Sequence, residues 1–122
     1  MVTTYAVWAS VRIVPNRQHP FPTPIPDALD QVMAHMLSLE DEQLRDTSIA
    51  MTLDGEGATV EIEALVDAYN VGQAYARLST DIRASLHAAE IGTANWGQGA
   101  DPFVDAGFEA DLPQIRGMVS AQ

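Results

Sequence analysis

The chain has 122 residues, a length typical of one domain with a single hydrophobic core. It contains no cysteine, which excludes disulfides, thiolate metal clusters and thiol nucleophiles. Seventeen Asp and Glu residues against six Arg and no Lys give a formal net charge of -11, which argues against nucleic-acid binding because that class needs clustered basic residues.

Residues 3–14 alternate between apolar and other side chains, a pattern that predicts a β-strand. One face would carry Tyr5, Val7, Ala9, Val11 and Ile13, and the other Thr4, Ala6, Trp8, Ser10 and Arg12. Residues 15–26 contain five prolines, which remove backbone donors and hold the chain extended, so we expect a connection there.

A helix is predicted over residues 27–37, capped by Asp27 and with Asp30 in its first turn. Its apolar stripe would be Leu29, Val32, Met33, Met36 and Leu37. Residues 47–53 and 58–66 alternate on either side of the sequence DGEG, which predicts a hairpin. Its inward side chains would be Ile49, Met51, Leu53, Val60, Ile62, Ala64 and Val66.

A long second helix is predicted to begin at a capping box formed by Asn70 and Gln73 and to end near Gly92. Its stripe would be Val71, Tyr75, Leu78, Ile82, Leu86 and Ala89. The chain from Thr93 onward is acidic and contains four glycines and two prolines, which predicts a loop or a docked extended arm. Only residues 102–109 suggest a further strand, and Gly107 interrupts them.

The order strand, helix, hairpin, helix predicts an α+β fold of the ferredoxin-like, split βαβ type, with both helices on one face of an antiparallel sheet. Residues 1–92 would form this domain, and residues 93–122 would form an arm that packs on it or on a partner. The 102–109 segment would supply a weak fourth strand.

The sheet face away from the helices carries Trp8 among small side chains, a mixture that predicts a covered surface. A second copy of the chain, a ligand or the arm could cover it, and a homodimer is the arrangement we expect. The predicted interface residues are Trp8, Ser10, Thr52, Leu65, Trp96, Phe103 and Phe108.

Motifs for catalysis are absent from the sequence. His19, His35 and His87 lack the spacing of metal ligands, and Asp54 with Glu56 is better explained as part of a turn than as a calcium loop. We therefore predict no catalytic, cofactor-binding or metal-binding residues. We also expect no signal peptide and no membrane span, because no stretch reaches about 18 apolar residues, and hence a cytoplasmic protein.

The sequence favours a non-catalytic protein–protein interaction module over an enzyme without deciding between them. Such a module would self-associate through the open sheet face and engage a protein partner through its acidic surface or arm. One alternative is a small-molecule-binding protein or a cofactor-independent enzyme of the dimeric α+β barrel type, with Tyr5, Trp8, His35 and Tyr75 around the substrate. Another is an acidic mimic of nucleic acid that inhibits a DNA-binding protein.

Overall fold

The computed structural model describes residues 1–15, 25–54, 57–96 and 107–121, and these form an α+β fold with a mixed sheet of six strands and two helices. The strands are β1 (Thr3–Pro15), β2 (Leu44–Asp54), β3 (Gly57–Ala68), β4 (Ile91–Gly92), β5 (Phe108–Ala110) and β6 (Gln114–Ser120). The helices are α1 (Ile25–Ser38) and α2 (Val71–Ala88), and a short 3-10 turn covers Ala94–Trp96. In this part of the chain, neither helix is both long and apolar enough to cross a membrane.

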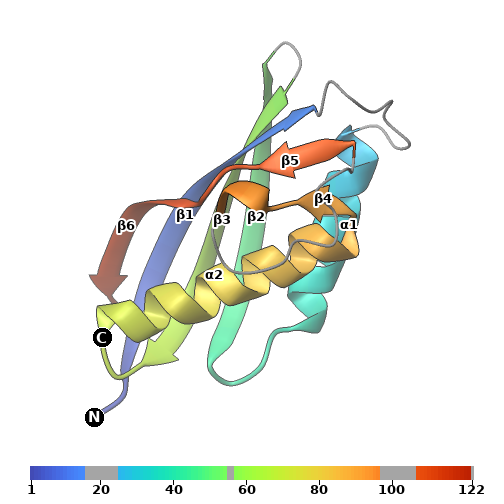
Figure 1. Ribbon diagram of the computed structural model, residues 1–122. Helices are drawn as coiled ribbons and strands as arrows, with labels where there is room; N and C mark the ends of the chain where they lie inside the picture. The colour runs from blue at the N-terminus through green and yellow to red at the C-terminus, as the bar shows by residue number, and fades with distance from the viewer. Residues whose placement is uncertain (16–24, 55–56, 97–106, 122) are drawn as a thin grey trace.

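Strand β1 is the centre of the sheet (Figure 1). It pairs antiparallel with β3 on one side and with both β5 and β6 on the other. Strand β2 lies beyond β3, and β4 joins β5 in parallel. Because β1 has neighbours on both sides, its backbone donors and acceptors find partners along both edges.

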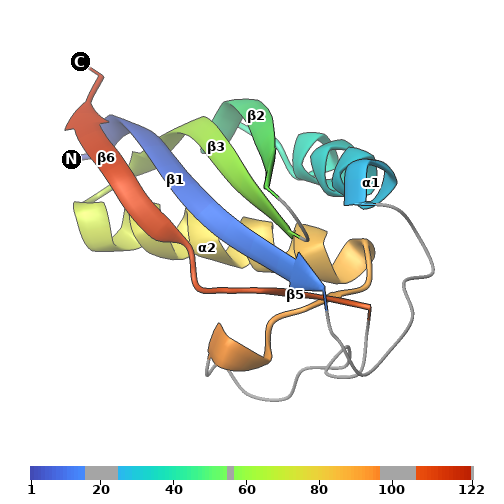
Figure 2. The ribbon, with the colours of Figure 1, turned by 90° about the horizontal axis from the view of Figure 1, so that it is seen from above.

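Both helices pack against the same face of the sheet, as the sequence predicts. Val7, Val11 and Ile13 of β1 are buried in one cluster with residues of both helices. The helical members of that cluster are Ala28, Leu29, Val32, Met36, Ala74, Leu78, Ile82 and Leu86. Figure 2 shows α2 lying across this face, with α1 on the side of β2.

The predicted capping box of α2 is present in a modified form. The side chain of Asn70 accepts a hydrogen bond of 2.9 Å from the backbone N–H of Gln73. The side chain of Gln73 in turn accepts a 3.0 Å bond from the N–H of Tyr69, one residue before the cap. The helix ends at Ala88 rather than near Gly92, because Glu90 adopts a left-handed conformation and the chain then enters β4.

Helix α1 differs from its prediction at both ends. It begins at Ile25, so Asp27 lies inside the first turn instead of capping it. Near its C-terminus Leu37 is exposed, whereas the unpredicted Ala28 is buried. Since Met36 is also buried, the apolar stripe is rotated about the helix axis relative to the sequence pattern.

Strand β2 also departs from its prediction. It begins at the buried Leu44, and a bulge between Arg45 and Ser48 accommodates Asp46, whose φ is 55°. Met51 and Leu53, predicted to face the core, are 38% and 56% exposed. Figure 1 gives the reason, since this end of the β2–β3 hairpin extends past both helices.

The arm contributes to the sheet in a way that the sequence pattern did not predict. Of the candidate segment 102–109, only its last residues are described in a strand, namely in β5. The main addition is β6, which pairs with residues 5–10 of β1 while β5 pairs with residues 13–15 along the same edge. The boundary predicted after Gly92 stays a prediction.

Candidate functional site

The sheet face away from the helices, here called the open face, is the first candidate site. Alternation along β1 places Trp8 and Ser10 on it, because the residues between them belong to the core. Trp8 is 37% exposed, whereas its neighbours Val7 and Ala9 are 1% and 0% exposed. The prediction of opposite faces for these residues is confirmed.

Three rows of side chains cross the open face from β6 through β1 to β3. Residues directly opposite each other in an antiparallel pair point to the same face, so the register defines each row. The rows are Val119–Ala6–Leu65, Gly117–Trp8–Glu63 and Gln114–Ser10–Glu61. The first row is apolar, the second has the indole at its centre, and the third is polar.

Gly117 provides the space in which the indole of Trp8 lies. A Cβ atom added at Gly117 would stand 2.2 Å from Cη2 and 2.3 Å from Cζ2 of Trp8. No side chain tolerates such a distance, so the ring covers the bare backbone of β6 directly. The glycine within this strand is therefore explained by close packing of an aromatic ring.

Arg116 reaches the open face through a bulge. The β1–β6 register shifts between Trp8 and Ala9, which leaves Arg116 without an opposite residue. Its Nε donates a 2.9 Å hydrogen bond to the hydroxyl of Ser10. The residue is exposed and forms no ion pair within the described part of the chain.

A cavity of about 220 Å³ lies beside Trp8. It is lined by Ala6, Val7, Trp8, Asp46, Glu63, Ala64 and Leu65. Asp46 and Glu63 are both exposed, and neither has an ion-pair partner among the described residues. The open face thus combines an aromatic ring and aliphatic side chains with charges of both signs.

At one end of the open face, Asp67 links the three strands β1, β2 and β3 through side-chain contacts. Its carboxylate accepts a 2.6 Å hydrogen bond from the hydroxyl of Thr4 and lies 3.2 Å from Nη1 of Arg45. The Thr4 hydroxyl and the Arg45 guanidinium together lower the pKa of Asp67 below its ordinary value, against a smaller opposing effect of desolvation. These contacts join β1, β2 and β3 at the end of the sheet where the chain begins.

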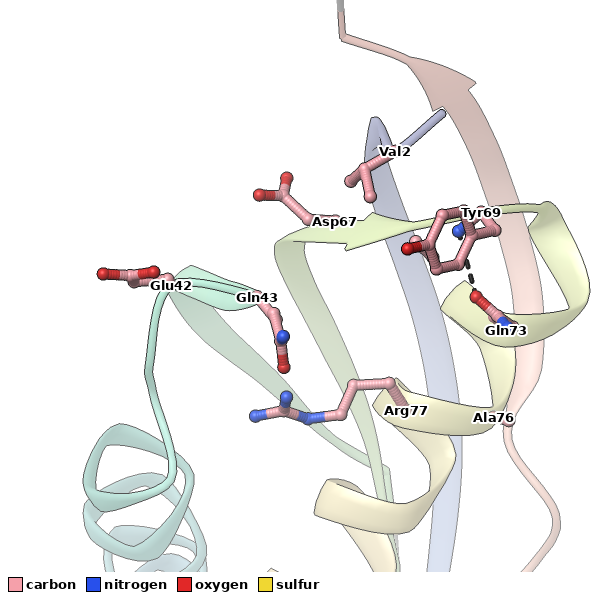
Figure 3. A pocket seen from close by; sticks show the side chains of 9 residues that line it. Val2, Glu42, Gln43, Asp67, Tyr69, Gln73, Ala76 and Arg77 are labelled. Carbon is pink, nitrogen blue, oxygen red and sulfur yellow. Dashed lines mark hydrogen bonds between the residues drawn. The ribbon is translucent and has the colours of Figure 1, made fainter.

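A second and larger cavity, of about 560 Å³, lies where α2 begins (Figure 3). Its lining residues are Val2, Glu42, Gln43, Asp67, Ala68, Tyr69, Gln73, Ala76 and Arg77. In Figure 3 the side chains of Gln43 and Arg77 point toward one another, and Tyr69 lies above Gln73. Tyr69 is 63% exposed, so its ring forms an open wall.

The charged groups around this second cavity hold the α1–β2 connection to α2. Arg77 donates from Nε to Asp81 at 3.0 Å, and from Nη2 to Asp41 and to the carbonyl of Leu39, both at 3.2 Å. Partial burial opposes the charge of Arg77, but the two carboxylates raise its pKa.

Asp41 stabilises the α1–β2 connection through hydrogen bonds to its backbone. Its carboxylate accepts the backbone N–H groups of Gln43 at 2.8 Å and Leu44 at 3.0 Å. These two bonds, followed by the contact with Arg77, lower its pKa. The carboxylates of Asp41 and Asp81 are thus already engaged, and the arrangement is that of a structural clamp.

The four residues proposed to surround an enzyme substrate are not brought together. Trp8 points to the open face, whereas the Nδ1 atom of His35 lies 3.0 Å from the hydroxyl of Ser85, between the two helices. In the described ranges no group of three His, Cys, Asp or Glu side chains could hold a metal ion. His87 lies elsewhere, with Nε2 2.8 Å from the hydroxyl of Thr93.

The predicted interface residues divide into two groups. Trp8, Ser10, Thr52 and Leu65 occupy strand positions on the open face. Trp96 and Phe108, by contrast, are core residues, and the indole of Trp96 donates a 3.1 Å bond to the carbonyl of Ala110. They cannot cover Trp8, so their assignment to the interface is corrected. Phe103 lies outside the described residues.

Sequence reasoning missed Arg116, Gly117 and Val119, which lie on the open face through β6. A signal for them exists in the apolar residues Ile115, Met118 and Val119, but the bulge breaks their alternation. Only the register of β6 shows that the arm forms one side of the open face.

Comparison of the chain with models of known protein families, with curated proteins and with solved structures gives no match.

Proposed function

We propose that this chain is a self-associating interaction module in which the open face of one copy binds the open face of a second. The domain would be a variant of the ferredoxin-like, split βαβ plan. The element order β1-α1-β2-β3-α2 and the pairing of β6 beside β1 support this plan. The lack of cysteine suits a reducing cytoplasm, where we propose that the dimer acts.

The observation that carries the proposal is the exposure of Trp8 at the centre of an uncovered sheet. A tryptophan presents roughly 250 Å² of surface, so the exposed 37% corresponds to about 90 Å². Covering that area would contribute about 2 kcal/mol per copy. Val119, 55% exposed, and Leu65 add apolar surface in the next row.

Charge favours a second copy on this face over other surfaces of the chain. A protein of net charge -11 repels itself over most of its surface. Three of its six arginines, Arg12, Arg45 and Arg116, occupy positions on the open face. The same face carries the carboxylates of Asp46, Glu61, Glu63 and Asp67, so charges of both signs could pair between two copies there. The acidic surface outside this face would remain available to a basic protein partner.

Solution mass tests the proposal. Light scattering after gel filtration should give twice the chain mass for the unmodified protein at about 0.1 mM. Replacing Trp8 by Glu places a charge at the centre of the face and should give the mass of one chain. The matched control is Tyr69→Glu, an equally drastic change at an exposed aromatic residue outside the face, which should leave the dimer intact. A monomeric unmodified protein would refute the proposal.

A further inference from the structure

The two strands that flank β1 carry opposite charges on the open face. Glu61 and Glu63 are exposed on β3, and Arg116 is exposed on β6. Strands β3 and β6 are two strand spacings apart, about 10 Å. Arg116 forms no ion pair with either glutamate within one copy, in keeping with that separation. Across a dimer the same charges could meet.

A twofold axis between two sheets that pack face to face lies in the plane of the interface. If the axis runs along β1, the rotation leaves each row at the same position along the strands. It exchanges the β3 end of the row with the β6 end. Strand β6 of one copy then lies over β3 of the other. If the axis runs across the strands instead, β3 lies over β3, and the glutamates of both copies oppose each other.

The first arrangement matches each row with itself. Val119 of one copy faces Leu65 of the other, Trp8 faces Trp8, and Arg116 approaches Glu61 and Glu63. The second arrangement places like charges in contact, which costs several kcal/mol in an interface. We infer that the twofold axis runs along β1 over Trp8, so that Arg116 of each copy pairs with Glu61 and Glu63 of the other. This inference rests on the proposed function.

Two variants with reversed charges test the pairing. The first carries Arg116→Glu, and the second carries Glu61→Arg and Glu63→Arg. By symmetry each variant alone places like charges at two contacts, so its dimer dissociation constant should rise by about tenfold or more. In an equimolar mixture every contact again joins Arg to Glu, so heterodimers should form with nearly the original affinity.

The control variant carries Asp30→Arg and Glu90→Arg, two exposed acids in α1 and just after α2, outside the open face. It changes the net charge by the same amount as the second variant and should remain a dimer. Circular dichroism confirms the fold of each variant, and sedimentation equilibrium gives the dissociation constants.

If each reversed-charge variant dimerises weakly alone and the equimolar mixture of the two dimerises strongly, the result supports the axis along β1. If the reversed variants dimerise as well as the unmodified chain while Trp8→Glu does not, the axis is wrong and the self-association proposal stands. The axis is equally wrong if folded variants weaken and the mixture restores nothing. If the unmodified chain is a monomer, both proposals fall.

Discussion

Replacing Gly117 by Ala tests the packing that positions Trp8. The new Cβ would stand 2.2, 2.3 and 2.6 Å from three atoms of the indole, so the ring must move. Overpacking of this kind costs about 1–3 kcal/mol, and the lower half of that range applies because the indole can rotate away. We expect the free energy of unfolding to fall by about 1–2 kcal/mol.

The same substitution should behave differently once the ring is absent. A Trp8→Ala background removes all three indole atoms that the new methyl group would meet first, and replacing glycine by alanine restricts the unfolded chain, which stabilises by about 0.4–1 kcal/mol. Gly117→Ala should then be neutral or stabilising. Urea unfolding followed by circular dichroism, with all four chains at one concentration, measures this coupling. Equal destabilisation by Gly117→Ala with and without Trp8 would refute the packing argument.

Three further predictions concern the rest of the fold. Asn70→Ala removes the cap of α2 and should lower the free energy of unfolding by about 1 kcal/mol in urea, whereas the neighbouring Val71→Ala at an exposed position should change it much less. Arg77→Met leaves Asp81 buried without its partner and should cost about 2 kcal/mol in urea, partly recovered by adding Asp81→Asn; no recovery would argue against the ion pair. The pKa values of Asp41 and Asp67 are lowered in the folded protein, so their stabilising effect is present above the unfolded pKa of about 4 and is lost as the pH falls through the folded values. The melting temperature should therefore drop as the pH falls below about 4, and it should drop less steeply for Asp67→Asn than for the unmodified protein. The same pH dependence in both proteins would contradict the role given to the Thr4 and Arg45 contacts.

Alternation and capping chemistry predicted the centre of the fold well. The two faces of β1 and β3 and the Asn70 cap follow from patterns local to a few residues. A buried strand must alternate, and a helix start must satisfy its free N–H groups. These constraints are readable in the sequence because they do not depend on where distant segments lie.

The remaining errors come from tertiary arrangement. Met51 and Leu53 continue the alternation of β2, but the hairpin extends beyond the helices that would bury them. Strand β6 escaped prediction because a bulge and Gly117 interrupt its pattern, and the space at Gly117 is taken by the indole of Trp8 from another strand. Trp96 and Phe108 are aromatic residues of the arm, and composition alone did not show that they enter the core.

The absence of cysteine allows a direct test of the open-face dimer. A single cysteine placed at Ala6, next to Trp8 on the same face, would lie close to its counterpart in a second copy related by an axis along β1, since packed sheets are about 10 Å apart. A short bismaleimide should then link two chains covalently, whereas a cysteine at the exposed Ala84 on α2 should give single chains under the same conditions. Single chains from the Ala6 variant at about 0.1 mM, or equal linking at Ala84, would contradict an open-face dimer whose axis runs along β1.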